Sequence, residues 1–300
     1  MIKSVQEITP DLTLLSSHPT LAGFEDFIGT YFFHSEKKVL VDVGPRVAIP
    51  GLLNVMSQAD INSDDIDYII LTHLHMDHAG GIGLAVKEMK NARVVAHSRA
   101  FNHLVDPVIL WKASQETLGG LALKYGNIDP VPENRIIVAE DGMKLDLGKG
   151  MVLEIYLTPG HAPHHLCVFD RMEGVLLVGD MAGIQMDGFL RPGTPPPFRF
   201  RDYMTSLDKM IALQPTILGY AHFGCYDNAV ERLLAVKAQT MLWYEIALAG
   251  VKDGKNAEEI IELIGKKDKT IDKLNALDKS IFQRDRTLIM NTVRGLMTAK

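Results

Sequence analysis

Four apolar segments of this chain each have a histidine or an aspartate at or close to their carboxyl end, and this recurrence constrains the fold most. The segments are DYIILTH (67–73), MVLEIYLTPG (151–160), GVLLVGD (174–180) and TILGYAHFG (216–224). Short, nearly continuous apolar runs are typical of strands buried on both faces. Open α/β architectures place their chemistry at the carboxyl ends of such strands. The sequence therefore predicts an α/β fold with a functional site at its strand ends.

Other segments extend this pattern. Alternating or apolar runs bounded by turn residues predict further strands over 11–17, 26–33, 37–44 and 92–98, and helical periodicity predicts helices over 48–59 and 82–89. The stretch 99–128 is helical in period, and its expected apolar face comprises Leu104, Val108, Leu110, Leu118 and Leu121.

The composition changes after about Asn228. From there to the end proline is absent, and 230–250 reads as one long amphipathic helix. Asn256 is followed by early acids and late lysines, which predicts a capped helix, and two further helices should follow it. We therefore expect a catalytic domain over 1–227 and a C-terminal helical extension over 228–300.

Bulk properties restrict the partners and the compartment. The net charge of −6 argues against a nucleic-acid partner. Two cysteines cannot form a disulfide framework, the first residues lack a signal-peptide pattern, and no 18-residue apolar run occurs. These features predict a cytoplasmic protein that acts on a small molecule and does not enter a membrane.

The segment THLHMDHAGG (72–81) concentrates residues that bind metals. In an extended backbone His73, His75 and Asp77 alternate and point the same way, whereas His78 turns toward a neighbouring position. Such an arrangement can supply two adjacent cations. A histidine-rich surface loop is the alternative, but it would not explain His161, Asp180 and His222 at three further strand ends.

The order H-x-H-x-D-H (73–78), G-H (160–161), G-D (179–180) and a late histidine resembles the metallo-β-lactamase superfamily over roughly residues 10–227. The resemblance implies a four-layer αβ/βα sandwich with two metals at one edge. It assigns His73, His75 and His161 to one metal, and Asp77, His78 and His222 to the other, with Asp180 bridging them. It also implies that Asp42 orients a ligand histidine.

Imidazole and carboxylate ligands suit zinc best, with iron or manganese as alternatives. Two metals about 3.5–4 Å apart would share a water and lower its pKa, and the resulting hydroxide would attack a carbonyl or phosphoryl centre. Asp77 is the carboxylate expected to orient that hydroxide and accept its proton.

Neighbouring residues are less constrained by the sequence. His165 is either a hydrogen-bonding partner of a ligand or an ordinary packing residue, and Cys225 reads as a small buried hydrophobe. The Pro/Gly-rich loop 181–202 would contribute Phe189, Arg191 and Phe198 to a substrate pocket.

The substrate is not fixed by these residues. The helical extension resembles hydroxyacylglutathione hydrolases (glyoxalase II-like enzymes), but no lysine follows Asp180 within the loop and Phe223 stands where they carry tyrosine. Lactonases carry a tyrosine where this chain has Gly183. We expect hydrolysis of a carboxylic ester, thioester or lactone. The alternatives are a phosphodiester hydrolase and a non-catalytic metal-binding protein. The long helix 230–250, with Met241, Leu242, Trp243 and Tyr244, is expected to bury a face against the catalytic domain or against a second chain, and of these we favour a homodimer.

Overall fold

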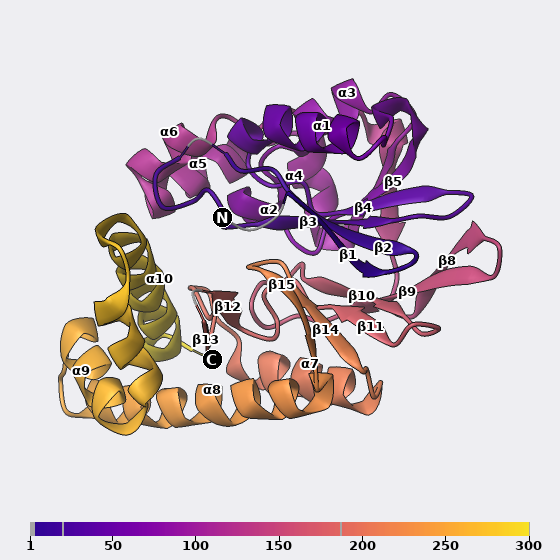
Figure 1. Ribbon diagram of the computed structural model, residues 1–300. Coiled ribbons are helices and arrows are strands. Elements are labelled where there is room, and N and C mark those ends of the chain that lie inside the picture. The colour runs from indigo at the N-terminus through magenta and orange to yellow at the C-terminus, as the bar shows by residue number, and fades with distance from the viewer. Residues whose placement is uncertain (1–3, 20, 187, 300) are drawn as a thin grey trace.

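Two mixed β-sheets pack face to face at the centre of the protein, with helices on both outer faces (Figure 1). The computed structural model describes residues 4–19, 21–186 and 188–299. Position 187 of the expected pocket loop and the outermost residues of both expected domains therefore lie outside the described residues. The layering confirms the four-layer αβ/βα sandwich.

The first sheet holds its seven strands in chain order. They are β1 (Val5–Thr9), β2 (Leu12–Ser16), β3 (Gly29–Phe33), β4 (Lys38–Val41), β5 (Ile66–Ile70), β6 (Arg93–His97) and β7 (Ile136–Ala139). The first four strands are antiparallel neighbours, and β4 to β7 are parallel. The carboxyl ends of β4 and β5 therefore lie side by side.

The second sheet has the order β15-β14-β11-β10-β9-β8. Its strands are β8 (Met143–Gly148), β9 (Met151–Leu157), β10 (Leu166–Asp170), β11 (Val175–Leu177), β14 (Ile217–Tyr220) and β15 (Gly224–Asp227). Strands β11 and β14 are parallel, and β9 points the same way because β10 is antiparallel to both β9 and β11. Three carboxyl ends thus share one edge of this sheet.

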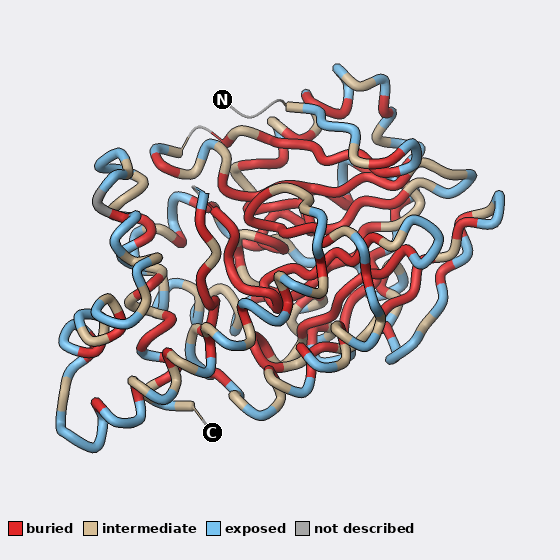
Figure 2. Tube along the Cα trace, turned by 60° about the horizontal axis from the view of Figure 1, so that its bottom comes forward, coloured by how far each residue is buried: buried red, intermediate tan, exposed pale blue. Residues whose placement is uncertain are grey.

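The apolar core follows these layers. Side chains from both sheets, including Phe33, Val41, Ile155 and Leu177, form a cluster between them. Figure 2 shows the buried trace along the strands of both sheets. This burial on the inner and outer faces explains why the strands read as nearly continuous apolar runs.

The helices associated with the first sheet are α1 (Ile49–Gln58), α2 (Met76–Ala79), α3 (Ile82–Glu88), α4 (Phe101–Val105), α5 (Val108–Leu118) and α6 (Gly120–Tyr125). The stretch 99–128 is broken at Pro107 and again at Gly119, whose φ of +56° is left-handed. Its expected apolar face is therefore divided: Leu104 is buried, but Val108 is 68% exposed.

The helices associated with the second sheet are α7 (Phe200–Ala212), α8 (Ala229–Lys252), α9 (Ala257–Lys267) and α10 (Lys279–Met297). Asn256 caps α9 with a reciprocal bond to Glu259, as its sequence predicted. Two further helices were expected after α9. In the part of the chain that the structure describes, only α10 is a full helix there, because the chain between α9 and α10 forms a 3-10 segment, Lys269–Ala276. Trp243, Ile260 and Val293 from α8, α9 and α10 share one hydrophobic cluster with the second sheet.

The expected loop 181–202 contains a small hairpin, β12 (Ile184–Met186) and β13 (Phe189–Arg191), and the start of α7. Short 3-10 turns occupy 46–48, 63–65, 98–100 and 133–135. Among the described residues, no helix combines the length and the apolar character needed to cross a bilayer.

Candidate metal centre

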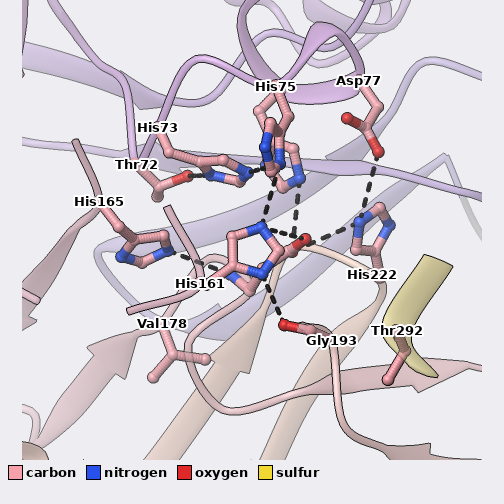
Figure 3. A network of polar contacts seen from close by, with 12 residues as sticks. Thr72, His73, His75, Asp77, His161, His165, Val178, Gly193, His222 and Thr292 are labelled. Carbon is pink, nitrogen blue, oxygen red and sulfur yellow. Dashed lines mark hydrogen bonds and ion pairs between the residues drawn. The ribbon is translucent and has the colours of Figure 1, made fainter. Parts of the chain in front are cut away.

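The candidate metal ligands lie just beyond the carboxyl ends of four strands. The segment 72–78 follows β5, and His161, Asp180 and His222 follow β9, β11 and β14. Since the two sheets face each other, these loops meet at one edge of the sandwich, and all seven predicted ligands come together there. Figure 3 shows His73, His75 and Asp77 of the segment 72–78 converging with His161 and His222 from the other sheet.

The first group consists of His73, His75, His161 and Asp180, whose ligand atoms all lie within 4.8 Å of one another. Nδ1 of His75 is 2.9 Å from Nε2 of His73 and 3.0 Å from Nε2 of His161. Two nitrogens that bind one zinc tetrahedrally at about 2.1 Å lie roughly 3.4 Å apart. The three nitrogens are therefore near the spacing at which they could share one cation.

The second group consists of Asp77, His78 and His222, which satisfy the same criterion. Nε2 of His222 lies 3.6 Å from Oδ2 of Asp77. Asp180 connects the two groups: its Oδ2 is 3.4 Å from Nε2 of His161, and its Oδ1 is 3.4 Å from Nε2 of both His78 and His222. One carboxylate thus presents an oxygen to each group.

Hydrogen bonds on the far side of the rings fix their orientation. Nδ1 of His161 donates to the carbonyl of Gly193 at 2.7 Å, and Nδ1 of His222 donates to the carbonyl of Phe27 at 2.8 Å. These bonds set the tautomer and leave Nε2 of each ring directed at the cluster. Figure 3 shows the bond from His161 to Gly193.

Asp42 holds the start of the ligand segment. It follows β4, has a φ of +56°, and its buried carboxylate accepts bonds from the backbone N–H and the hydroxyl of Thr72 at 2.8 and 2.7 Å. Nδ1 of His78 lies 2.9 Å from Asp42 Oδ2, and Nδ1 of His73 donates to the Thr72 hydroxyl at 3.0 Å. Asp42 therefore orients His78 directly and His73 through Thr72.

The charges of the cluster suit a cationic occupant. Burial, followed by the neighbouring histidines, lowers the pKa of His73 and His75 well below the usual value, so both rings are neutral and can act as ligands. Burial alone would raise the pKa of Asp180, but His222, His78 and His161 outweigh it and hold that pKa well below its usual range. Burial alone would lower the pKa of His78, but the carboxylates of Asp180, Asp77 and Asp42 outweigh it and raise that pKa well above its usual value.

Two buried atoms provide the strongest test of metal fit. Among the described residues, Nε2 of His78 and Oδ1 of Asp180 lie 3.4 Å from each other, but neither atom makes a well-formed hydrogen bond. Such atoms are costly to bury unless something else satisfies them. Both face the centre of the cluster, and imidazole and carboxylate donors suit divalent zinc, iron or manganese. The residues therefore fit divalent metal ions.

Two further histidines support the ligand loops. The ring of His165 is buried. Its Nδ1 lies 2.9 Å from the Thr158 hydroxyl, and its Nε2 accepts the backbone N–H of Asp180 at 3.3 Å. His164, to which the sequence assigned no role, accepts the backbone N–H of Leu74 through Nδ1 at 3.3 Å. The pair of histidines that follows His161 was the only local signal for these contacts.

A pocket of about 220 Å³ opens onto the cluster. Besides the candidate ligands His75, Asp77, His161, Asp180 and His222, its lining includes Leu110, Ala113, Ser114, Thr117 and Leu118 of α5, Ile184, Gly193, Pro195 and Pro196, and Leu288, Asn291 and Thr292 of α10. The contribution of α10 has no signal in the local sequence, because an amphipathic helix reveals a buried face but not its partner.

The structure places several sequence candidates elsewhere. Phe189, Arg191 and Phe198 are buried but do not line this pocket. Arg191 forms a buried ion pair with Asp285 of α10, and Phe198 packs against Tyr203 in the core beside the second sheet. Cys225 lies beside the Tyr31 hydroxyl and outside both ligand groups, and burial raises its pKa to about 12.

Comparisons with known proteins agree with this fold. The model of the metallo-beta-lactamase superfamily matches residues 26–222. The metallo-beta-lactamase fold-containing protein ST1585 of Sulfurisphaera tokodaii is 31% identical over 76% of this chain and 85% of its own length. The probable metallo-hydrolase YqjP of Bacillus subtilis is 26% identical over 68% of this chain and 69% of its own length.

A solved structure extends the likeness to the helical region. The crystal structure of archaeal ST1585 superposes with a TM-score of 0.73 over 96% of this chain and 98% of that one, at 25% identity. A four-layer sandwich with a histidine–aspartate cluster at its strand ends defines a class of metal-binding αβ/βα proteins. Within that class, this chain belongs to the metallo-beta-lactamase superfamily.

Proposed function

We propose that this protein is a dinuclear metal-dependent hydrolase that cleaves a carboxylic ester, thioester or lactone of a small molecule. The observation that carries the proposal is the position of Asp180, whose two oxygens face the two ligand groups separately. A carboxylate in this position is suited to joining two cations, for which zinc is the first candidate. When bound, such cations would acidify a water and polarise the oxygen of the bond to be cleaved.

The remaining chemistry depends on Asp77. Its carboxylate lines the pocket beside His222, and its side chain is 20% exposed, so it can reach both the attacking water and the substrate. We assign Asp77 the role of orienting that water and accepting its proton. The hydrogen bonds of His161 and His222 to backbone carbonyls keep their rings fixed while the proton moves.

Two lines of support favour an acyl substrate over a phosphodiester. Among the described residues, the pocket wall contains no lysine or arginine to accompany a phosphate. The helical extension, which underlies the resemblance to hydroxyacylglutathione hydrolases, supplies one wall through α10. The name of YqjP, a probable metallo-hydrolase, is consistent with hydrolysis.

Purified protein loaded with zinc tests the proposal. We expect close to two metal ions per chain by elemental analysis, and cleavage within a panel of p-nitrophenyl esters, thioesters, lactones and bis(p-nitrophenyl) phosphate. Asp77→Asn keeps the size and one oxygen of the side chain but removes the base. It should reduce kcat by about 10²–10⁴-fold with a smaller effect on KM.

Three outcomes would count against specific parts of the proposal. A stoichiometry near one would exclude the dinuclear site. Preferential cleavage of the phosphodiester would replace the acyl assignment. Absence of all cleavage by metal-loaded protein would favour a non-catalytic metal-binding role.

A further inference from the structure

The pocket above the candidate metal centre lies between two helices that are distant in the sequence. The helix α5 contributes one wall and α10 contributes another, and the segment 193–196 lies beside the candidate ligand His161. Because Asp77, His161, Asp180 and His222 line the same pocket, a substrate whose reacting bond lies at these residues must place an adjoining group between the walls.

Most of the wall is apolar. Leu110, Ala113 and Leu118 line it from α5, and Ile184, Pro195, Pro196 and Leu288 line it from the other segments. Two hydroxyls of α5 are already engaged within the helix, since Ser114 donates to the carbonyl of Leu110 at 2.8 Å and Thr117 donates to that of Ala113 at 2.9 Å. A group bound here would therefore find mainly hydrophobic contacts.

Among the residues that the structure describes, no cationic side chain in this wall could compensate a negatively charged ligand group. Neither lysine nor arginine occurs among the described residues that line the pocket. Arg191 of β13 and Arg284 of α10 are buried, and both pair with Asp285. An anionic group between the helices would lose its hydration without gaining an ion pair, which is strongly unfavourable.

One polar side chain on α10 is available to a ligand. Asn291 lines the pocket, and within the described part of the chain its amide makes no hydrogen bond, whereas Thr292 next to it donates to the carbonyl of Pro192 at 3.2 Å. An uncharged amide can donate to, and accept from, a neutral polar group such as a carbonyl or a hydroxyl. Its chemistry matches an uncharged ligand.

We infer that the substrate carries an uncharged, predominantly apolar group next to the scissile acyl bond, held between α5 and α10. This inference rests on the proposed hydrolase function. The pocket volume of about 220 Å³ is below the roughly 300–1,000 Å³ of drug-sized ligand sites, so the group is of modest size. Leu118 and Asn291 are the specificity-determining residues that face it.

Matched esters test the charge preference directly. The p-nitrophenyl ester of hexanoic acid and the mono-p-nitrophenyl ester of adipic acid have acyl chains of equal carbon number, but only the second carries a free carboxylate. We expect zinc-loaded protein to cleave the hexanoate with at least a tenfold higher kcat/KM. Equal or faster cleavage of the adipate would overturn the inference.

Variants of α5 assign the preference to this wall. Leu118→Arg introduces a cation and should reverse or abolish the preference for hexanoate, whereas the uncharged Leu118→Gln should weaken hexanoate cleavage without favouring adipate. Ile109→Arg is the matched control, because Ile109 lies on the same helix, is 71% exposed and does not line the pocket. If Leu118→Arg behaves like Ile109→Arg, the pocket does not select the substrate.

A binding experiment separates this inference from the proposed reaction. Saturation-transfer NMR on metal-free protein should detect hexanamide but not the anionic monoamide of adipic acid, and Leu118→Arg, but not Ile109→Arg, should suppress the hexanamide signal. If no ester is cleaved while hexanamide still binds, the hydrolase proposal fails and the pocket assignment stands. Equal binding of both amides would refute the pocket assignment.

Discussion

Nδ1 of His161 donates a 2.7 Å hydrogen bond to the carbonyl of Gly193, and α10 holds the backbone on both sides of that glycine. The hydroxyl of Thr292 donates to the carbonyl of Pro192 at 3.2 Å, and the hydroxyl of Thr194 donates to the carbonyl of Thr292 at 3.1 Å. The helix α10 is thereby connected to the candidate metal ligand His161, because Thr292 binds the two residues that flank Gly193.

Removal of the Thr292 hydroxyl should weaken metal binding. Thr292→Val keeps the shape but loses the bond to Pro192, and we expect the affinity for the first metal to fall about 3–10-fold. This is less than the 10–100-fold typical of a direct partner of a ligand. Chelator competition measures the affinity, and the absorption spectrum of cobalt-loaded protein reports the geometry. Thr292→Ser should restore both, and a Thr292→Val protein with unchanged affinity and spectrum would contradict the connection.

The approach of α10 to this segment predicts a large effect of one methyl group. A Cβ added to Gly295 would lie 1.7 Å from the carbonyl oxygen of Thr194, so Gly295→Ala should lower the free energy of unfolding by about 1–3 kcal/mol. Gly265 of α9 is the matched control: an added Cβ there would have its nearest neighbour at 3.8 Å, and Gly265→Ala should stabilise by about 0.5–1 kcal/mol. Urea unfolding of both variants tests the pair, and effects of equal sign would be inconsistent with the packing described.

Asp42 should control metal retention without binding metal itself. Asp42→Asn weakens the contact with Nδ1 of His78 and the support of Thr72, and we expect metal affinity to fall about 10–100-fold. Metal content after dialysis against a weak chelator measures the loss. Asp170→Asn is the control, because Asp170 is equally buried, ends β10 and accepts the backbone N–H of Met172 in the turn that follows. Equal losses in both variants would point to general destabilisation.

His164 should make the metal-free protein sensitive to acid. Burial, with smaller effects of neighbouring histidines, lowers its pKa to about 4, whereas the unfolded value is about 6.5. Below pH 6.5 the unfolded chain therefore binds a proton that the folded chain does not, and stability falls until the pH reaches about 4. The pKa difference corresponds to roughly 3 kcal/mol. Between pH 6.5 and 4, His164→Gln should reduce the slope of the free energy of unfolding plotted against pH. An unchanged slope would exclude this role.

An apolar stripe of exposed residues on α8 supports the predicted homodimer. Leu234, Met241 and Leu248 are 52%, 41% and 37% exposed and recur every seven residues, which is typical of a helix that packs against another helix. Trp243, on the opposite side of α8, is buried in the chain's own core. We expect sedimentation to show a dimer that Met241→Glu converts to a monomer. Val138→Glu, at an equally exposed position on β7, should remain dimeric; a monomeric parent protein would refute the prediction.

Several elements were predictable because their signals are local. The strand β5, the helix α3 and the cap of α9 follow from apolar periodicity and from Asn256, and the structure places all three close to the expected positions. The break of 99–128 into three helices was only partly readable, since Pro107 and Gly119 interrupt a pattern whose period continues across them. The hairpin β12–β13 was missed because each strand has only three residues.

The sequence by itself determined which histidines and aspartates form the candidate ligand set. Metal-binding side chains at successive strand ends can be recognised without knowing how the strands pair, because each signal lies within a few residues. The tertiary structure alone decided what surrounds the ligands. It turned Arg191 toward Asp285 and brought α5 and α10 to the pocket. An amphipathic helix specifies that one face is buried, and only the packing of the whole chain selects what it is buried against.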